Sequence, residues 1–142
     1  MFITRATRHD KADLEEFFKA EDWDDPVLDR GIAYIARDGA IVGNVRLIEV
    51  APETVIVEDV LVKQDRRGQG LGERLMKAAM AGKGGTLYLC CHPERLRFYT
   101  DLGFTELPFD DQPEDVRAYF QQHGDAPPEL PPGHVHHFMK AR

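Results

Sequence analysis

One stretch, residues 54–72, constrains the fold of this chain more than any other. An apolar strand, TVIVEDVLV, runs into a turn that carries Arg66, Arg67 and three alternating glycines. Such a turn leaves successive backbone N–H groups uncovered by side chains, and it leads into a helix whose first turn has unpaired donors and a positive dipole end. The stretch therefore predicts an anion site. A pyrophosphate fits this site best, because the two arginines add bidentate charge at its edge.

The glycine spacing distinguishes this turn from the two commonest nucleotide motifs. In GQGLG the third glycine comes one residue too early for the dinucleotide fingerprint, and no Lys-Ser or Lys-Thr pair follows as in a P-loop. A plain tight connection between strand and helix is the alternative, but it does not account for the two preceding arginines. A nucleotide-binding α/β domain stays open as a competing interpretation.

Composition and charge limit the partners that this chain can have. Its 142 residues are 42% hydrophobic, so we expect one compact domain spanning 1–142. The 18 Lys+Arg against 25 Asp+Glu give a net charge of -7, which argues against binding nucleic acid or an anionic membrane surface. No run approaches the ~18 apolar residues of a membrane span. Adjacent Cys90 and Cys91 would point to opposite faces of a strand, which opposes a disulfide. We expect a cytoplasmic protein, monomeric or homodimeric.

Hydrophobic periodicity and turn signals predict the order of the elements. An Asp-Gly turn joins two strands into a hairpin, and a strand, helix and strand from residue 54 to 91 make one parallel βαβ unit. Asp10 is the expected N-cap of the first helix, Pro26 should begin a short helical turn, and Asp111 with Glu114 has capping-box spacing. The expected strands are 2–7, 31–39, 40–50, 54–62, 86–91, 104–107 and 134–140. The expected helices are 9–20, 71–81, 93–99 and about 112–123.

Two segments together resemble the GNAT superfamily of N-acetyltransferases. They are VLVKQDRRGQGLGERLM, starting at Val60, and RFYTDLGF, starting at Arg97. The order of expected elements from residue 2 to about 107 is similar to that family's fold as well. The resemblance implies an α+β fold with a central mixed, mostly antiparallel sheet of six to seven strands. About four to five helices would flank this sheet, and its fourth and fifth strands would splay. Segment 108–133 lies outside the resemblance and would be a lid or a dimer contact.

The resemblance also implies acetyl-CoA as cofactor. In the family's signature, Arg67, Gly70 and Gly72 would wrap the pyrophosphate, while the main chain of β-strand residues 60–62 would bind the pantetheine arm like an added strand. The full expected cofactor-binding set is Val60, Leu61, Val62, Arg66, Arg67, Gly68, Gln69, Gly70, Leu71, Gly72, Glu73, His92, Arg95 and Phe98. His92 and Arg95 stand where the family often has Asn and Ala. Capping of the next helix is the alternative for His92, and a solvent-facing position is the alternative for Arg95.

Two residues are expected to carry catalysis. Glu58 and Asp59 are adjacent in a strand and should face opposite ways, so they form no carboxylate pair. Similar strands in amine-acetylating members imply that Glu58 is the base or orders a water, with a structural salt bridge as the alternative. The resemblance implies that Tyr99 protonates the leaving thiolate, with an aromatic core position as the alternative.

The acceptor is expected to be a primary amine of a small cationic molecule, acetylated by direct attack in a ternary complex. Its expected contacts are Trp23, Asp24, Asp25 and Asp59. The alternative for the acidic segment is a solvated loop anchored by Trp23. Acetylation of a protein N-terminus or lysine, and a non-catalytic coenzyme A-binding regulatory module, are the competing functions.

We expect no metal. His134, His136 and His137 invite a metal site, but acidic ligands at a defined spacing are absent nearby and the reaction requires no ion. Cys91 as an acetylated nucleophile is possible in chemistry, but a core position suits its apolar surroundings better.

Overall fold

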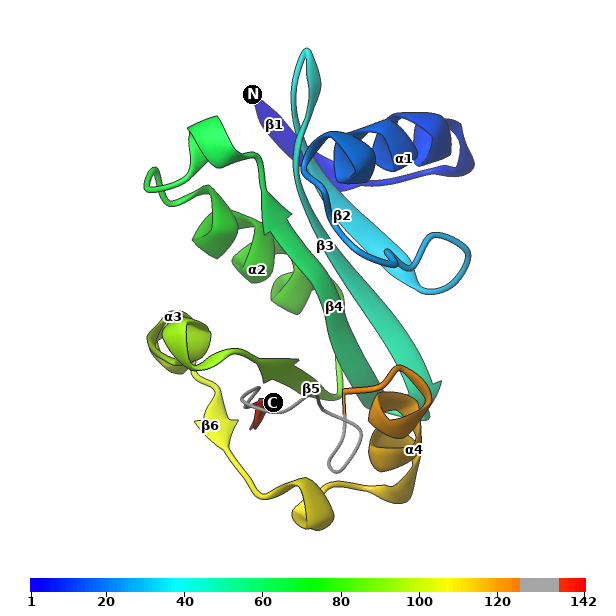
Figure 1. The fold of residues 1–142 in the computed structure, drawn as a ribbon, viewed down its shortest axis with the longest axis vertical. Coiled ribbons are helices and arrows are strands. Elements are labelled where there is room, and N and C mark those ends of the chain that lie inside the picture. The colour runs from blue at the N-terminus through cyan, green and yellow to red at the C-terminus, as the bar shows by residue number, and fades with distance from the viewer. Residues whose placement is uncertain (126–135) are drawn as a thin grey trace. The chain divides into compact units, whose positions relative to one another are not determined.

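The computed structural model describes residues 1–125 and 136–142, and the chain divides into two compact units. Unit 1 comprises Met1–Ile48 and Val57–Lys83, and unit 2 comprises Glu49–Ile56 and Gly84–Arg142. Figure 1 shows the helices and strands of both units. In the described part of the chain, no helix is long and apolar enough to cross a membrane.

The strands form a seven-stranded sheet in the order β1-β2-β3-β4-β5-β7-β6. Pairs β1–β2, β2–β3, β5–β7 and β6–β7 are antiparallel, whereas β4 and β5 are parallel. The expected α+β fold with a mixed, mostly antiparallel sheet is confirmed. The strands are β1 Phe2–Arg5, β2 Ile32–Asp38, β3 Ala40–Ala51, β4 Thr54–Val62, β5 Thr86–Cys91, β6 Thr105–Glu106 and β7 His137–Ala141.

Four α-helices accompany these strands among the described residues, at the lower end of the expected range. The βαβ unit is confirmed, with its helix beginning at Leu71 as expected and its two strands pairing from Thr54 to Ile56 and from Thr86 to Tyr88. The helices are α1 Lys11–Ala20, α2 Leu71–Gly82, α3 Leu96–Asp101 and α4 Glu114–Gln122.

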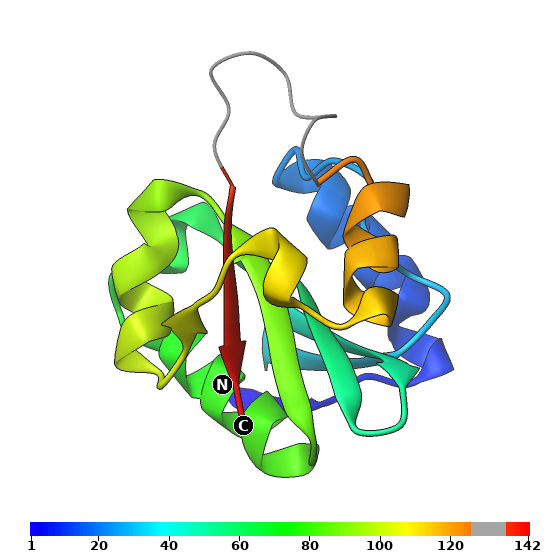
Figure 2. The ribbon, with the colours of Figure 1, turned by 90° about the horizontal axis from the view of Figure 1, so that it is seen from below.

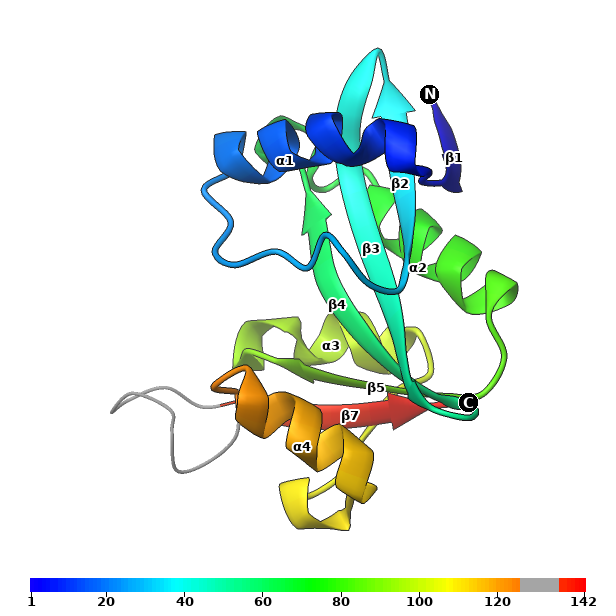
Figure 3. The same cartoon turned by 90° about the vertical axis from the view of Figure 1, so that its right-hand side faces the viewer.

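In unit 1, α1 and α2 cover opposite faces of the strands (Figure 3). Ile35 of β2 is buried in a cluster with Leu14 and Phe18 of α1. The next residue, Ala36, points to the other face, where it pairs with Gly43 of β3. A Cβ on Gly43 would lie 2.6 Å from Leu75 Cδ1 of α2. Glycine at this position therefore lets α2 approach the sheet closely.

In unit 2, α3 and α4 lie to either side of β7 (Figure 2). Phe138 of β7 packs against Phe120 of α4 with ring centroids 5.4 Å apart, and against Phe109 at 5.1 Å. The neighbouring Met139 points to the opposite face, where its sulfur lies 3.9 Å from Cys91 Sγ. Because side chains alternate along β7, one face of the β5–β7 ladder packs against α4, and Met139 and Cys91 meet on the other face.

Three local predictions need correction. Asp10 precedes α1 as expected, but its carboxylate accepts from Thr7 N at 2.7 Å and so completes a capping box one turn earlier. The helical turn predicted from Pro26 is wrong, because Val27 donates its N–H to the distant Asp59 carboxylate instead. The capping box predicted for Asp111 is also wrong, since Pro113 precedes α4 and no side chain caps it.

The final strand is shorter at its start than predicted. It runs from His137 to Ala141, and His136 precedes it in irregular structure. The first two residues of the predicted strand, 134 and 135, lie outside the described residues, as does most of the proline-rich segment before them.

Candidate active site

Strand β4 carries Glu58, the expected base, and its extended geometry is interrupted at the next residue. Asp59 has a φ of 52°, in the left-handed region that a strand residue does not normally adopt. Side-chain faces assigned by strict alternation therefore do not continue across this residue. Glu58 itself is half-buried.

The side chain and main chain of Asp59 are bound to two other segments of unit 1, the acidic loop and β3. Asp59 is 8% exposed, and its carboxylate accepts from Trp23 Nε1 at 2.9 Å and from Val27 N at 2.7 Å. Its main-chain oxygen accepts from Asn44 Nδ2 at 2.9 Å. Burial raises the pKa of Asp59, while the two hydrogen bonds and the charge of Arg46 oppose that rise. These are the contacts of a structural anchor, and an acceptor-binding role for Asp59 stays a prediction.

The acidic loop is consequently tied to β4. Trp23 is 37% exposed but holds Asp59 through its ring N–H, and Glu21 Oε1 accepts from Gln64 N at 2.8 Å. Asp24 and Asp25 lie exposed between these anchors and Val27. Anchoring by Trp23, considered above as the alternative role, is what its contacts show. Acceptor binding by Trp23, Asp24 and Asp25 stays a prediction.

The glycine turn fits the pyrophosphate that the sequence predicts. Gly68 and Gly70 both have φ of 78°, and a Cβ built on either would meet nothing within 4 Å. Gly70 is the N-cap of α2, so the unpaired N–H groups of the first turn border this open space. The residues present therefore suit close approach of a phosphate to the main chain.

The two arginines beside this turn are held differently. Arg66 Nη1 lies 2.7 Å from Asp38 Oδ2 at the end of β2, so its charge is already paired. Arg67 is exposed and donates Nε to Val62 O at 3.0 Å. Glu73, also in the expected set, forms an i,i+4 ion pair with Lys77 at 2.7 Å. Arg67 is thus better suited than Arg66 to meet an incoming phosphate.

Unit 2 holds the other expected residues. Tyr99 is buried on α3, with its ring edge-to-face against Phe98 at 5.0 Å and Phe104 at 5.8 Å. His92 makes no side-chain capping bond to the 3₁₀ turn that follows it, so the capping alternative is wrong. Its ring instead lies edge-on to that of His136, with centroids 5.1 Å apart. Arg95 is exposed.

The two cysteines differ in environment, and no disulfide involves either. Burial, with the nearby charges of Glu106 and Glu94, raises the pKa of the Cys91 thiol to about 11. A thiol with so high a pKa is a poor nucleophile at neutral pH. The structure therefore supports the core position for Cys91.

One cluster was missed by the sequence reasoning. Cys90, Asp125 and His136 bring possible ligand atoms within 4.8 Å of one another, whereas His137 binds Glu106 Oε1 at 2.6 Å. His134 lies outside the described residues. The three clustered residues come from separate elements, so no spacing in the sequence joins them. The one available signal was alternation along the last strand, which separates His136 from His137.

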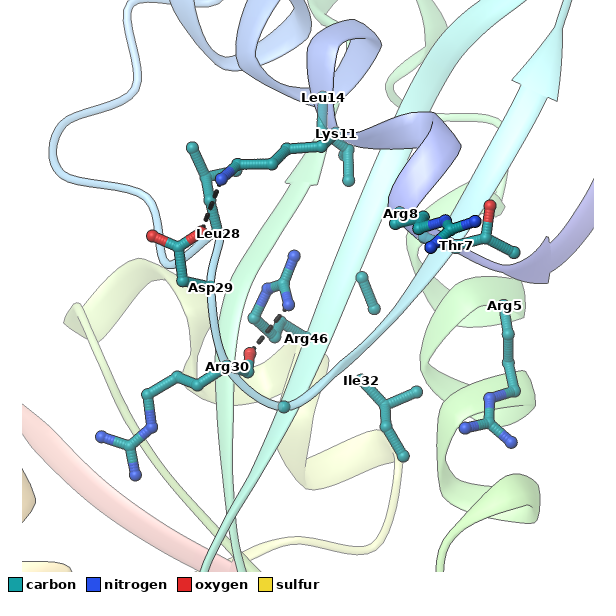
Figure 4. Close-up of a pocket in the computed structure, with 13 residues that line it drawn as sticks. Arg5, Thr7, Arg8, Lys11, Leu14, Leu28, Asp29, Arg30, Ile32 and Arg46 are labelled. Atoms are coloured by element: carbon teal, nitrogen blue, oxygen red, sulfur yellow. Dashed lines mark hydrogen bonds and ion pairs between the residues drawn. The ribbon is translucent and has the colours of Figure 1, made fainter.

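A pocket of about 400 Å³ in unit 1 was also not anticipated (Figure 4). Arg46 of β3 lines it, is 5% exposed and donates Nη1 to Arg30 O at 2.8 Å. Among the described residues the Nε atom of Arg46 has no partner. Lys11 at the rim is paired with Asp29 at 2.6 Å. Burial lowers the pKa of Arg46, and the charges of Asp59 and Asp29 oppose this.

Comparison with known families decides the class of the chain. The model of the Acetyltransferase (GNAT) domain family matches residues 29–106. The chain belongs to this family. Its members are acetyltransferases that use acetyl-CoA, so the expected family, enzyme class and cofactor are confirmed. The match includes the glycine turn, β4 and the Phe98–Tyr99 pair.

Solved structures support the same fold. N-acetylglutamate synthase from Neisseria gonorrhoeae, complexed with coenzyme A and N-acetyl-glutamate, has a TM-score of 0.69 at 18% identity, covering 100% of this chain and 35% of that one. This chain thus spans about a third of that synthase. An aminoglycoside 6'-N-acetyltransferase complexed with coenzyme A has a TM-score of 0.67 at 17% identity, covering 99% and 96%. A GNAT-family acetyltransferase from Streptococcus pneumoniae has 0.66 at 26%, covering 79% and 92%.

Proposed function

We propose that this acetyltransferase acetylates a primary amine of a small cationic molecule, by direct transfer in a ternary complex. The observation that supports this acceptor class is the acidic loop tied to β4 by the Trp23–Asp59 hydrogen bond of 2.9 Å. Asp24 and Asp25 are exposed on that loop, and Glu58 immediately precedes the anchoring Asp59 in β4. Carboxylates on a fixed loop attract a cation and lower the entropic cost of holding it.

The donor is proposed to bind along β4 and over the glycine turn. Main-chain groups of Val60–Val62 pair with the amides of the pantetheine arm, and the N–H groups around Gly68–Gly72 surround the pyrophosphate. Arg67 adds charge there. His92, Arg95 and Phe98, which belong to unit 2, stay predicted cofactor-binding residues. When bound, acetyl-CoA supplies an activated acetyl thioester.

Two side chains are proposed to move the protons. An alkylamine has a pKa of about 10 and is mostly protonated at neutral pH, so Glu58 accepts its proton directly or through a water. The Tyr99 hydroxyl donates a proton to the departing thiolate, whose thiol pKa is near ~8.5. The Val60 N–H polarises the carbonyl that is attacked. No covalent acyl-enzyme intermediate is required by this scheme.

A second acceptor class is favoured by Arg46. A buried guanidinium with an unpartnered Nε, in a pocket of about 400 Å³, suits the carboxylate of an amine such as an amino acid. Arg5 and Arg8 line the same pocket, as does the ion pair of Lys11 with Asp29. This acceptor would be zwitterionic, whereas the first acceptor class is cationic. The charge of the preferred acceptor therefore distinguishes the two classes.

Steady-state kinetics with a panel of amines tests the proposal. The panel contains polyamines, aminoglycosides, free amino acids, and peptides offering only an N-terminus or a lysine. We expect the highest kcat/KM for a cationic amine. In the double variant Asp24→Asn, Asp25→Asn, the KM for that amine should rise. Turnover of amino acids alone, abolished by Arg46→Gln, would establish the second class instead. Turnover of peptides alone would select protein acetylation, and no turnover with retained coenzyme A binding would select the regulatory module.

Several expectations stay predictions beside this proposal. They are the single domain, the cytoplasmic location and the oligomeric state. The apolar residues Val116, Tyr119 and Phe120 of α4 are buried inside unit 2. A role of 108–133 as a lid or dimer contact therefore cannot draw on that face of α4.

A further inference from the structure

We propose that Cys90, Asp125 and His136 form a binding site for a zinc ion. One possible ligand atom from each residue lies within 4.8 Å of the others. Thiolate, imidazole and carboxylate are the three side-chain ligand types that Zn²⁺ takes. In a tetrahedral site with bonds of about 2.0–2.3 Å, ligand atoms are roughly 3.3–3.8 Å apart, so a contraction of about 1 Å would close the cluster around an ion.

The strand register explains why these residues meet. Cys90 is paired with Phe138 across the antiparallel β5–β7 ladder, so both side chains point to the same face. His136 immediately precedes β7, and its ring lies against that of His92, which follows Cys90 by two residues. Phe120 of α4 packs on Phe138 on the face shared with Cys90, and α4 ends just before Asp125. The site is therefore a product of the fold of unit 2, not of sequence spacing.

The ring of His136 points its Nδ1 atom at Asp125, 3.9 Å from the Oδ1 atom of that carboxylate. Its Nδ1 atom lies 3.0 Å from the main-chain oxygen of Asp125. A carbonyl oxygen can only accept, so this bond places the proton on Nδ1 and leaves the lone pair on Nε2. Metal-binding histidines commonly donate their second N–H to a backbone carbonyl in this way.

A second imidazole lies beside the cluster. The His92 ring lies edge-on to that of His136, with centroids 5.1 Å apart, and His92 follows Cys90 by two residues. Zinc sites with three protein ligands keep a fourth position for water, and sites with four are closed. The core of the proposal is the set of three residues, and His92 decides only whether the site is open or closed.

The neighbouring residues provide matched controls. Cys91 and His137 are paired with each other across the same ladder, on the opposite face from Cys90. Cys91 contacts Met139, and His137 contacts Glu106. Each control thus carries the same chemical group one residue away, without access to the proposed ion.

The test uses the full chain, freed of any purification tag and treated with EDTA. Calorimetric titration with ZnCl₂ should give one ion per chain, and Zn²⁺ should raise the unfolding temperature. Cys90→Ser, Asp125→Asn and His136→Gln should each weaken binding at least tenfold, a loss of about 1.4 kcal/mol. Cys91→Ser and His137→Gln should bind like the parent. Circular dichroism checks that each variant is folded.

Cobalt substitution gives a second readout that does not depend on stability. Co²⁺ bound to the parent should show a thiolate-to-metal charge-transfer band, which Cys90→Ser removes and Cys91→Ser retains. The proposal is overturned if the parent binds no Zn²⁺ at millimolar concentration. It is equally overturned if the control variants lose as much affinity as the cluster variants. None of these measurements uses acetyl transfer, so failure here leaves the proposed function untouched.

Discussion

Trp23 Nε1 donates to Asp59 Oδ1 at 2.9 Å, which joins the acidic loop of unit 1 to β4 immediately beside Glu58. The same carboxylate holds Val27 N at 2.7 Å, so one buried side chain fixes two points of a loop that has no regular structure between residues 23 and 31. Asp59 thus holds the first part of the loop, while Asp29 and Arg30 further along it are bound by Lys11 and Arg46.

Removal of this carboxylate should destabilise the protein. Asp59→Ala leaves two donors without their charged acceptor, and we expect a loss of roughly 3 kcal/mol in the free energy of unfolding. Asp59→Asn keeps one acceptor and tolerates the left-handed backbone, so its loss should be about half as large. Urea unfolding measures both. Equal stability of Asp59→Ala and the parent would contradict the anchoring role.

Catalytic variants should separate chemistry from binding. Glu58→Gln and Tyr99→Phe should each lower kcat by about 10²- to 10⁴-fold, because each removes a proton-transfer group. The KM for acetyl-CoA should change little, and Glu58→Gln should also flatten the acidic limb of the pH–rate profile. Tyr88→Phe removes another buried tyrosine hydroxyl, from β5, and serves as the control. An unchanged rate in both catalytic variants would remove these two assignments.

The glycine turn should not tolerate a side chain. Gly70→Ala puts a Cβ on a residue with φ of 78°, where an L-residue costs about 1–2 kcal/mol. It also fills the space through which we propose the pyrophosphate approaches, so the KM for acetyl-CoA should rise at least several-fold. Gly84→Ala is the control, since its Cβ meets nothing within 4 Å and no positive φ is required there. A Gly70→Ala enzyme with the parent's KM would argue against this turn as the phosphate site.

The Asp10 capping box should make unit 1 sensitive to acid. Its hydrogen bond with Thr7 N and its contact with Arg37 hold the pKa of Asp10 below the ordinary value of 3.8. A lowered folded-state pKa stabilises the fold above about pH 4, and that contribution disappears as the pH falls through the folded pKa. Asp10→Asn should therefore show a smaller loss of unfolding free energy between about pH 6 and pH 3 than the parent does. Asp24→Asn, at an exposed loop position, is the comparison, and equal losses in the parent and Asp10→Asn would be evidence against the linkage.

Local signals in the sequence predicted most of the fold. The apolar pattern of β4 and the helical spacing of apolar residues in α2 depend on neighbouring residues alone. Both elements begin where expected, at Thr54 and Leu71. The glycine turn between them was recognisable because glycine is itself the signal for an unusual backbone conformation. The family resemblance rested on the same local residues, and the family match confirmed it.

What escaped prediction depends on contacts between distant segments. Val27 lacks its helical turn because its N–H meets Asp59, and Asp59 leaves the extended conformation in a strand whose composition gives no sign of it. The Arg46 pocket and the Cys90–Asp125–His136 cluster each require several elements to meet. No acidic ligand stands at a defined spacing from the histidines near the end of the chain, and the fold brings Asp125 to His136.

Cys90 and Cys91 occupy adjacent positions of β5 but open onto different surroundings, one toward Asp125 and His136 and the other toward Met139. A slip of β5 by one residue against β7 would exchange the two thiols, placing the sulfur of Cys91 among the polar groups and that of Cys90 in the core. Thiol accessibility at these two positions thus reports the register of the ladder. Faster alkylation of Cys90 than of Cys91 in solution would show that β5 and β7 pair in the register described here.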